Sequence, residues 1–242
     1  MIDMIDGALF QRMVIHASAS ISAELNVFPV PDGDTGTNMS LTISTAAAEA
    51  RKKPAATVGQ AAATNASALL RGARGNSGVI LSLLFRGVSK ALKDHDTADG
   101  VVLAAALNEG VSAAYKAVMK PAEGTILTVS RMSAARAAGA AREDNCFQSV
   151  LEQAIQEGQT ALAQTINMNP VLKKAGVVDA GGMGFMTILK AMLASLRGEV
   201  TAPVSAAKPK APVEEKTAFE VFDTEDITFA FDTVYIVRKN DP

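Results

Sequence analysis

The 242-residue sequence contains no tryptophan, a single cysteine and only 5% aromatic residues. Because Cys146 stands alone, a disulfide within the chain is excluded, and this cysteine usage is typical of a reducing compartment. The apolar residues, 48% of the chain, are mainly alanine, leucine, valine and isoleucine. That composition favours closely packed helices over a sandwich of β-branched strands, and we predict an all-α protein.

Long apolar runs, a basic leader and a surplus of positive charge are also absent. No stretch approaches the roughly 18 consecutive apolar residues of a membrane span. The sequence begins Met-Ile-Asp-Met-Ile-Asp, with acids where a signal peptide carries basic residues. Its 23 Lys and Arg against 25 Asp and Glu give a net charge of −2, hence no general attraction to nucleic acid or anionic membranes. We expect a cytoplasmic protein that binds no nucleic acid and has no membrane span.

Apolar periodicity and helix boundary signals predict eight main helices with short connections, which implies antiparallel neighbours. One apolar face, for example, carries Leu9, Met13, Ala17, Ile21 and Leu25 at every fourth position. The predicted helices cover about 6–25, 37–52, 57–70, 77–93 and 97–119, and three more begin near 125, 146 and 182. The last ends near 197, and a short helical turn at 170–175 precedes it.

The composition changes after Gly198. Residues 200–218 are rich in proline, alanine and lysine and show no periodic apolar face, which is typical of a linker. Residues 226–238 have the composition of a β-strand, but one strand is too short to fold alone. We therefore expect a helical domain at 1–199, a linker at 200–218 and, at 219–242, the start of a second domain that continues outside this sequence. An edge strand that folds back or pairs with a neighbouring molecule is the alternative.

The strongest functional signal is the polar loop at 31–39, in which Asp32 and Asp34 flank Gly33. Glycine permits backbone angles that let both carboxylates turn toward one point, and a helix is predicted to begin within the loop. Carboxylates attract hard cations, and helix N-termini attract phosphate. The loop therefore predicts a site for a metal–nucleotide complex, with Asp32 and Asp34 holding Mg²⁺.

Three further glycine-rich loops, at 71–78, 123–127 and 176–184, precede later helices. The loop at 71–78 matches neither the Walker A nor the Rossmann pattern, and its Arg74 is either a surface residue or one that neutralises charge on a transferring phosphoryl group. Each loop alone is also compatible with an ordinary turn or helix cap. In an up-and-down bundle, however, alternate connections lie at the same end, so the four loops should gather at one rim.

Four segments, in this order, resemble the ATP-binding subunit of bacterial fatty acid kinases. They are LNVFPVPDGDTGTNM (25–39), GARGNSGVIL (72–81), YKAVMKPAEGTIL (115–127) and VLKKAGVVDAGG (171–182). The N-terminal domain of that subunit is related to the DhaL-like nucleotide-binding domain of dihydroxyacetone kinase. The resemblance covers about residues 1–200 and implies a closed barrel of eight antiparallel helices with ATP and two Mg²⁺ ions at one end.

The resemblance also implies roles for single residues. Asp32 and Asp34 match the metal-holding carboxylates, and Asn26 stands near the place of a third metal-holding Asp, at a spacing one residue longer. The residues that match phosphate-contacting loops are Thr35, Gly36, Thr37, Asn38, Asn76, Ser77 and Gly78. Those that match the surroundings of the base and sugar are Thr125, Ile126, Asp179, Ala180 and Gly181.

In fatty acid kinases a separate protein binds the fatty acid and presents its carboxylate, and the product is an acyl phosphate. The resemblance therefore implies a fatty-acid-binding partner protein, and it leaves room for a homodimer formed through further domains. One alternative is the nucleotide-binding subunit of a dihydroxyacetone kinase, against which stand Asn26 and the longer segment before Asp32. The other is a non-catalytic nucleotide-binding module, against which stands the retention of Asp32 and Asp34.

Overall fold

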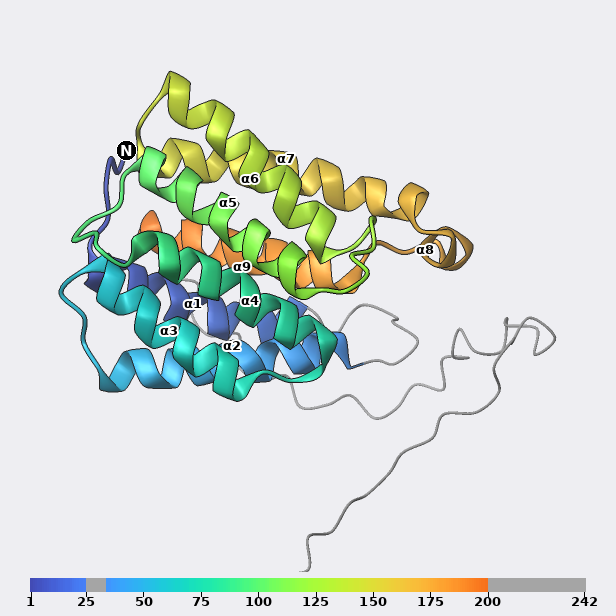
Figure 1. The fold of residues 1–242 in the computed structure, drawn as a ribbon, viewed down its shortest axis with the longest axis horizontal. Coiled ribbons are helices and arrows are strands. Elements are labelled where there is room, and N and C mark those ends of the chain that lie inside the picture. Colours follow the sequence, from blue (N-terminus) through green and yellow to red (C-terminus); the bar gives the residue numbers. More distant parts are fainter. Residues whose placement is uncertain (25–33, 200–242) are drawn as a thin grey trace, which may run out of the picture.

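The computed structural model of the chain describes residues 1–24 and 34–199 (Figure 1). Within these ranges it contains nine helices and no strand, apart from an isolated antiparallel bridge between Ile5 and Ala98. The prediction of an all-α protein is thus confirmed for the described part of the chain. The predicted linker, the strand-like segment, Asn26 and Asp32 lie outside the described residues.

The helices agree with the predicted ranges to within a few residues, and α8 matches the expected short turn. Their bounds are α1 (Gly7–Glu24), α2 (Thr35–Lys52), α3 (Val58–Gly72), α4 (Gly75–Leu92), α5 (Gly100–Ala117), α6 (Ile126–Glu143), α7 (Phe147–Met168), α8 (Pro170–Ala175) and α9 (Ala180–Leu196). None of these described helices is both long and apolar enough to cross a membrane.

Side-chain caps determine where several helices begin. The Oγ1 of Thr57 accepts a hydrogen bond of 3.2 Å from the Gln60 N–H at the start of α3, as its sequence predicts. The carboxylate of Asp99 accepts one of 2.9 Å from the Val102 N–H at the start of α5. Each cap satisfies an N–H group that has no partner within its helix.

Three helices begin about two residues earlier than predicted, α2 at Thr35, α4 at Gly75 and α9 at Ala180, because glycines that suggested loops form their first turns. The reason is packing between helices, which is invisible to local patterns. A Cβ atom at Gly78 would collide with the Thr42 hydroxyl of α2. Gly75 has a φ of +56°, and a Cβ there would collide with the Asn38 amide. Glycine is therefore required where α4 starts against α2.

The eight long helices close into a ring. Each helix from α1 to α7 packs against the next one in the chain, α7 packs against α9, and α9 returns to α1. The short α8 packs against α7 and projects from one end of the bundle, the end opposite the N-terminus (Figure 1). This arrangement agrees with the expected closed barrel of eight helices.

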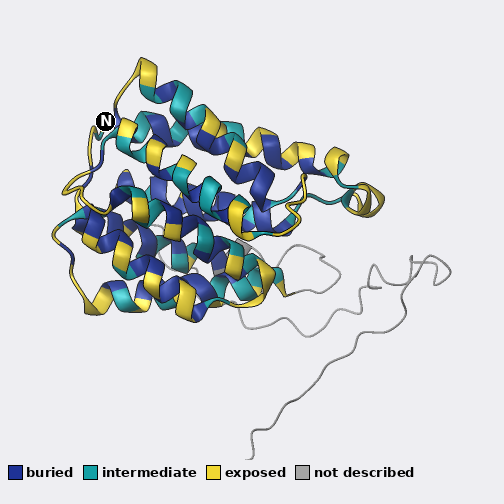
Figure 2. Cartoon of the chain, viewed as in Figure 1, coloured by how far each residue is buried: buried dark blue, intermediate teal, exposed yellow. Residues whose placement is uncertain are grey.

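Buried apolar side chains from the ring meet in one main core (Figure 2). Buried and exposed positions alternate along most of the long helices, as an amphipathic face requires, whereas α9 is buried along almost its whole length. The largest fully buried side chains include Met13, Ile21, Met39, Ile43, Leu69, Leu81, Leu151, Met186, Ile188 and Leu196. Burial of each such side chain contributes about 1.5–3 kcal/mol. Many of the remaining buried positions are alanine, which lets the helix axes approach closely.

A close contact between the backbones of α4 and α5 gives a test of the ring. A Cβ atom at Gly87 of α4 would collide with the Glu109 carbonyl of α5, which is backbone and cannot rotate away. We expect Gly87→Ala to lower the free energy of unfolding by about 1–3 kcal/mol or more, since α4 and α5 must separate. Urea unfolding followed by circular dichroism measures this change.

The matched control is Gly139→Ala in α6, where the nearest atom to a new Cβ is 3.9 Å away. There the substitution should stabilise the helix by about 0.5–1 kcal/mol, because alanine loses less backbone entropy than glycine. Equal effects of the two substitutions would show that α4 and α5 are not packed backbone to backbone.

Candidate functional site

The starts of α2, α4, α6 and α9 lie at the same end of the ring, which we call the rim (Figure 1). At this rim an open cavity of ≈ 220 Å³ is lined by residues of all four helix starts and of the segment between α8 and α9. Its lining consists of Thr35, Ser77, Ile80, Thr125, Ile126, Leu172, Val177, Val178, Asp179, Ala180 and Gly181. Most of these residues were assigned to a nucleotide site from the sequence.

The cavity combines two kinds of wall. Thr35, Ser77, Ile126 and Ala180 belong to the first turns of α2, α4, α6 and α9, where backbone N–H groups have no helical partner and the helix dipole is positive. The apolar lining residues had no role assigned from the sequence, although all of them lie within two of the segments that carry the family resemblance; they are Ile80, Leu172, Val177 and Val178. Such a cavity suits a ligand with an anionic part and a flat apolar part.

Asp34 directly precedes α2 at the rim, and its side chain is exposed. One carboxylate oxygen accepts a hydrogen bond of 2.8 Å from the Asn38 amide, and the side chain makes no capping hydrogen bond to the helix. Within residues 1–24 and 34–199, no three His, Cys, Asp or Glu side chains group closely enough to hold a metal ion. A metal site at Asp34 therefore needs further ligands from residues 25–33 or from a bound phosphate.

The turn between α3 and α4 is fastened to α2. The Arg74 N–H donates to Thr42 Oγ1 at 3.1 Å, and that hydroxyl donates to the Asn38 carbonyl at 2.6 Å. The Arg74 guanidinium donates to the Ala73 carbonyl at 3.1 Å and lines a second open cavity, together with Arg71. The structure therefore does not include Arg74 in the lining of the rim cavity, and its catalytic role stays a prediction.

The other predicted phosphate contacts are in the first turns of α2 and α4 but outside the lining of the rim cavity. They are Gly36, Thr37, Asn38, Asn76 and Gly78. Thr37 and Asn76 are exposed, whereas Gly78 is buried against Thr42. Their predicted contacts therefore require a ligand that extends beyond the cavity along these two helix starts.

Two helix caps also form part of the cavity wall. The Thr125 hydroxyl donates to the Ala122 carbonyl at 2.8 Å and accepts from the Leu127 N–H at 3.3 Å. Asp179 Oδ2 accepts from the Gly182 N–H at 2.6 Å. Burial raises the pKa of the Asp179 carboxyl, while hydrogen bonds from the backbone of Gly182 and Ile126 act in the opposite direction. Both side chains are thus held in place by their own helix starts.

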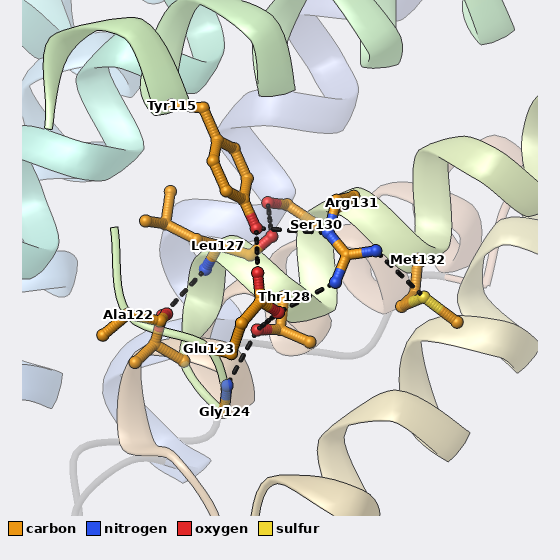
Figure 3. A network of polar contacts seen from close by, with 10 residues as sticks. Tyr115, Ala122, Glu123, Gly124, Leu127, Thr128, Ser130, Arg131 and Met132 are labelled. Atoms are coloured by element: carbon orange, nitrogen blue, oxygen red, sulfur yellow. Dashed lines mark hydrogen bonds and ion pairs between the residues drawn. The ribbon is translucent and has the colours of Figure 1, made fainter. Parts of the chain in front are cut away.

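Sequence reasoning missed a polar network behind Thr125, formed by Tyr115, Glu123, Thr128 and Arg131 (Figure 3). Glu123 was noted only as part of a glycine-containing loop. Arg131 is eight residues further along the chain, and no local pattern pairs residues at that separation across a loop and a helix. The only available signal was the spacing of Glu123, Thr128 and Arg131 around the start of α6.

Asp179 provides a test that depends on pH. Because its pKa is raised in the folded state, its contribution to stability is fully present below the ordinary value of 3.8 and is lost as pH rises through the folded value. Asp179→Asn keeps an oxygen for the α9 cap but does not titrate. We expect the free energy of unfolding of the wild type, minus that of the variant, to fall as pH rises from about 4 to about 7.

Urea unfolding at several pH values measures this difference, which cancels the titration of the other carboxylates. A difference that grows with pH would show that Asp179 is stabilised as a carboxylate by the fold.

Comparison with known proteins agrees with this geometry. Residues 29–194 match the family model of the DAK2 domain. The chain is 42% identical to Protein YloV of Bacillus subtilis over 245 residues, which cover 97% of this chain and 44% of that protein. It is also 42% identical to the uncharacterized protein SSP1546 of Staphylococcus saprophyticus, with coverage of 98% and 45%. The chain thus spans less than half the length of these relatives.

A solved structure shows the same fold. The dihydroxyacetone kinase of C. freundii superposes with a TM-score of 0.56 at 22% identity, over 78% of this chain and 34% of that one. At this identity the likeness concerns the fold alone. The family match extends over most of the ring, from the start of α2 to α9, and over every described residue that lines the rim cavity. The chain therefore belongs to the DAK2 domain family.

Proposed function

We propose that this domain binds Mg·ATP at the rim and donates the γ-phosphoryl group to a fatty acid carboxylate, which a separate fatty-acid-binding protein presents. The observation that carries the proposal is the rim cavity, where four helix starts meet an apolar wall. Helix N-termini suit phosphates, and Ile80, Leu172 and Val177 suit the face of a nucleotide base. Membership of the DAK2 domain family and the fold shared with a dihydroxyacetone kinase support a kinase.

In this proposal two Mg²⁺ ions are held by Asp34, Asp32 and the phosphates, with Asn26 as the candidate third protein ligand. Asp34 fits this role because its carboxylate is exposed and directly precedes the α2 N-terminus, so that a phosphate attracted there meets oxygen ligands of the kind that Mg²⁺ prefers. When bound, the ions neutralise charge on the triphosphate.

The transfer requires little chemistry from the protein. The bond between the γ-phosphorus and its bridging oxygen breaks, a carboxylate oxygen forms the new bond, and ADP leaves with an acyl phosphate as the other product. A carboxylic acid in water has a pKa of roughly 4, so the fatty acid is already ionised at neutral pH and needs no general base. The helix starts and Arg74 then act by positioning the phosphates and by stabilising negative charge.

The partner, the cellular location and the acceptor belong to the proposal as well. The low cysteine content supports a cytoplasmic reaction. The relatives are more than twice as long, which leaves room for domains that dock the fatty-acid-binding protein or form a homodimer. Dihydroxyacetone is the second candidate acceptor, favoured by the likeness of fold to a dihydroxyacetone kinase. A nucleotide-binding module without catalysis is the third candidate.

The metal site is tested by calorimetry with Mg·ATP. We expect Asp32→Ala and Asp34→Ala each to weaken binding at least about tenfold, because a carboxylate between Mg²⁺ and the triphosphate is lost. The control is Asp94→Ala, an exposed carboxylate in the α4–α5 connection at the other end of the ring. Unchanged affinity in both rim variants, with the helical spectrum intact, would refute the site.

The reaction is tested by trapping acyl phosphate with hydroxylamine. We expect little ATP turnover by this chain alone, and acyl phosphate when a longer protein with the additional domains is supplied with the loaded fatty-acid-binding partner. Arg74→Ala should lower the rate more than it lowers ATP affinity, since charge develops mainly in the transition state. The matched control is Arg71→Ala, because Arg71 lines the same second cavity as Arg74 but donates its hydrogen bond to Ser67. Phosphorylation of free dihydroxyacetone, with none of the fatty acid, would favour the second candidate.

A further inference from the structure

The polar network behind the rim cavity is centred on the Glu123 carboxylate (Figure 3). Its Oε2 accepts from Thr128 Oγ1 at 2.7 Å and from Arg131 Nη2 at 2.8 Å. Its Oε1 accepts from the Tyr115 hydroxyl at 3.2 Å, and that hydroxyl accepts from Arg131 Nε at 3.2 Å. One carboxylate thus joins the end of α5, the connecting loop and the first two turns of α6.

The network reaches the backbone of the turn that enters α6. The Thr128 hydroxyl, which is fully buried, accepts a hydrogen bond of 2.8 Å from the Gly124 N–H while it donates to Glu123. Gly124 has a φ of +76°, a left-handed conformation that only glycine adopts without strain. The Thr128 hydroxyl thus links the Glu123 carboxylate to the Gly124 N–H, so a movement of the carboxylate would be transmitted to this turn.

The same turn packs against the junction of α7 and α8. A Cβ atom at Gly124 would lie 2.9 Å from the Met168 Cβ and 3.3 Å from the Asn169 Cβ, at the junction of α7 and α8. The next residues on one side are Thr125 and Ile126, which line the cavity. On the other side the chain continues through α8 to the lining residues at 172 and 177–181. A shift of Gly124 would therefore alter the width of the cavity.

The strength of the network supports a function for it. The hydrogen bonds from Thr128 and Arg131 lower the pKa of Glu123, and the hydrogen bonds to Tyr115 and Glu123 raise that of Arg131, so both stay charged at neutral pH. Their side chains are 52% and 44% exposed, however, and exposed ion pairs add little to global stability. An effect of this pair on the turn is therefore separable from an effect on the fold.

We propose that Glu123 is a positioning residue for nucleotide binding, which acts through Thr128 and Arg131 to hold the Gly124 turn and hence the Thr125–Ile126 wall of the rim cavity. The inference rests on the proposed nucleotide site and adds to it a residue outside the cavity lining. It assigns to Glu123 no contact with the nucleotide.

The experiment compares the dissociation constant of Mg·ATP with the thermal midpoint in a set of variants. Glu123→Gln removes the charge at nearly constant shape, and Thr128→Val removes the hydroxyl. We expect each single variant to raise the dissociation constant of Mg·ATP about fivefold to tenfold. The double variant should bind Mg·ATP no more weakly than the weaker-binding single variant, because both substitutions act through one path. Thr128→Ser retains the hydroxyl and should bind Mg·ATP as tightly as the wild type does.

Glu109→Gln is the matched control, because Glu109 also forms an exposed ion pair, with Lys90 Nζ at 2.7 Å, but lies in the middle of α5. It should leave the dissociation constant unchanged. Amide hydrogen exchange at residues 124–127 gives a second readout without nucleotide, and it should be faster in Glu123→Gln.

The outcomes separate the two proposals. If Glu123→Gln and Thr128→Val bind Mg·ATP as tightly as the wild type does, the positioning role is overturned while the nucleotide site stands. Losses of Mg·ATP affinity that add up in the double variant would also overturn the positioning role. So would losses of affinity that are proportional to the fall in thermal midpoint. A wild type that does not bind Mg·ATP overturns the proposed function and, with it, the role of Glu123 in binding.

Discussion

The close approach of neighbouring helix backbones is the constraint on which the rest of the structure depends. Where α4 meets α5, Gly87 leaves no room for a side chain beside the Glu109 carbonyl, and Gly110 of α5 repeats this relation beside the Leu84 carbonyl of α4. Close neighbours in a ring of eight long helices alternate in direction, so every second helix starts at the same end. The rim with its four N-termini is a geometric consequence of this packing, before any residue of the site is chosen.

The residues at that rim serve the fold and the cavity together. Thr125 and Asp179 satisfy N–H groups at the starts of α6 and α9, and the same side chains line the cavity. Capping leaves the other N–H groups of each first turn available to a ligand. A bound anion would accept hydrogen bonds from the helix N–H groups that the caps leave without a partner. Ligand binding is thereby coupled to the order of the rim.

Much of the ring could be predicted from the sequence, because its signals are local. The apolar spacing from Leu9 to Ile21 predicts α1, and Thr57 with Gln60 predicts the start of α3. The earlier starts of α4 and α9 could not be predicted, because they depend on contacts that are distant in sequence: Gly75 and Gly78 lie against α2, and Gly182 lies against Val129 and Leu162. The pairing of Glu123 with Arg131 was missed because no local pattern relates residues eight apart across a loop and a helix, whereas the adjacent Thr125 and Ile126 were found as part of a recognisable motif.

Asp34 and Asp179, two carboxylates beside helix starts of the rim, differ in a way that bears on the proposed chemistry. Asp34 is exposed, and its hydrogen bond from the Asn38 amide occupies one carboxylate oxygen, so the side chain is accessible to a hydrated cation. Asp179 is half-buried, its pKa is raised by that burial, and its Oδ2 is committed to the α9 cap. Ionised Asp179 would repel a triphosphate, which fits its assignment, by resemblance, to the base and sugar rather than to the phosphates. Under the proposed function the phosphates and their metal therefore belong at Asp34 and the α2 start, and the base and sugar belong beside the carboxylate that caps α9.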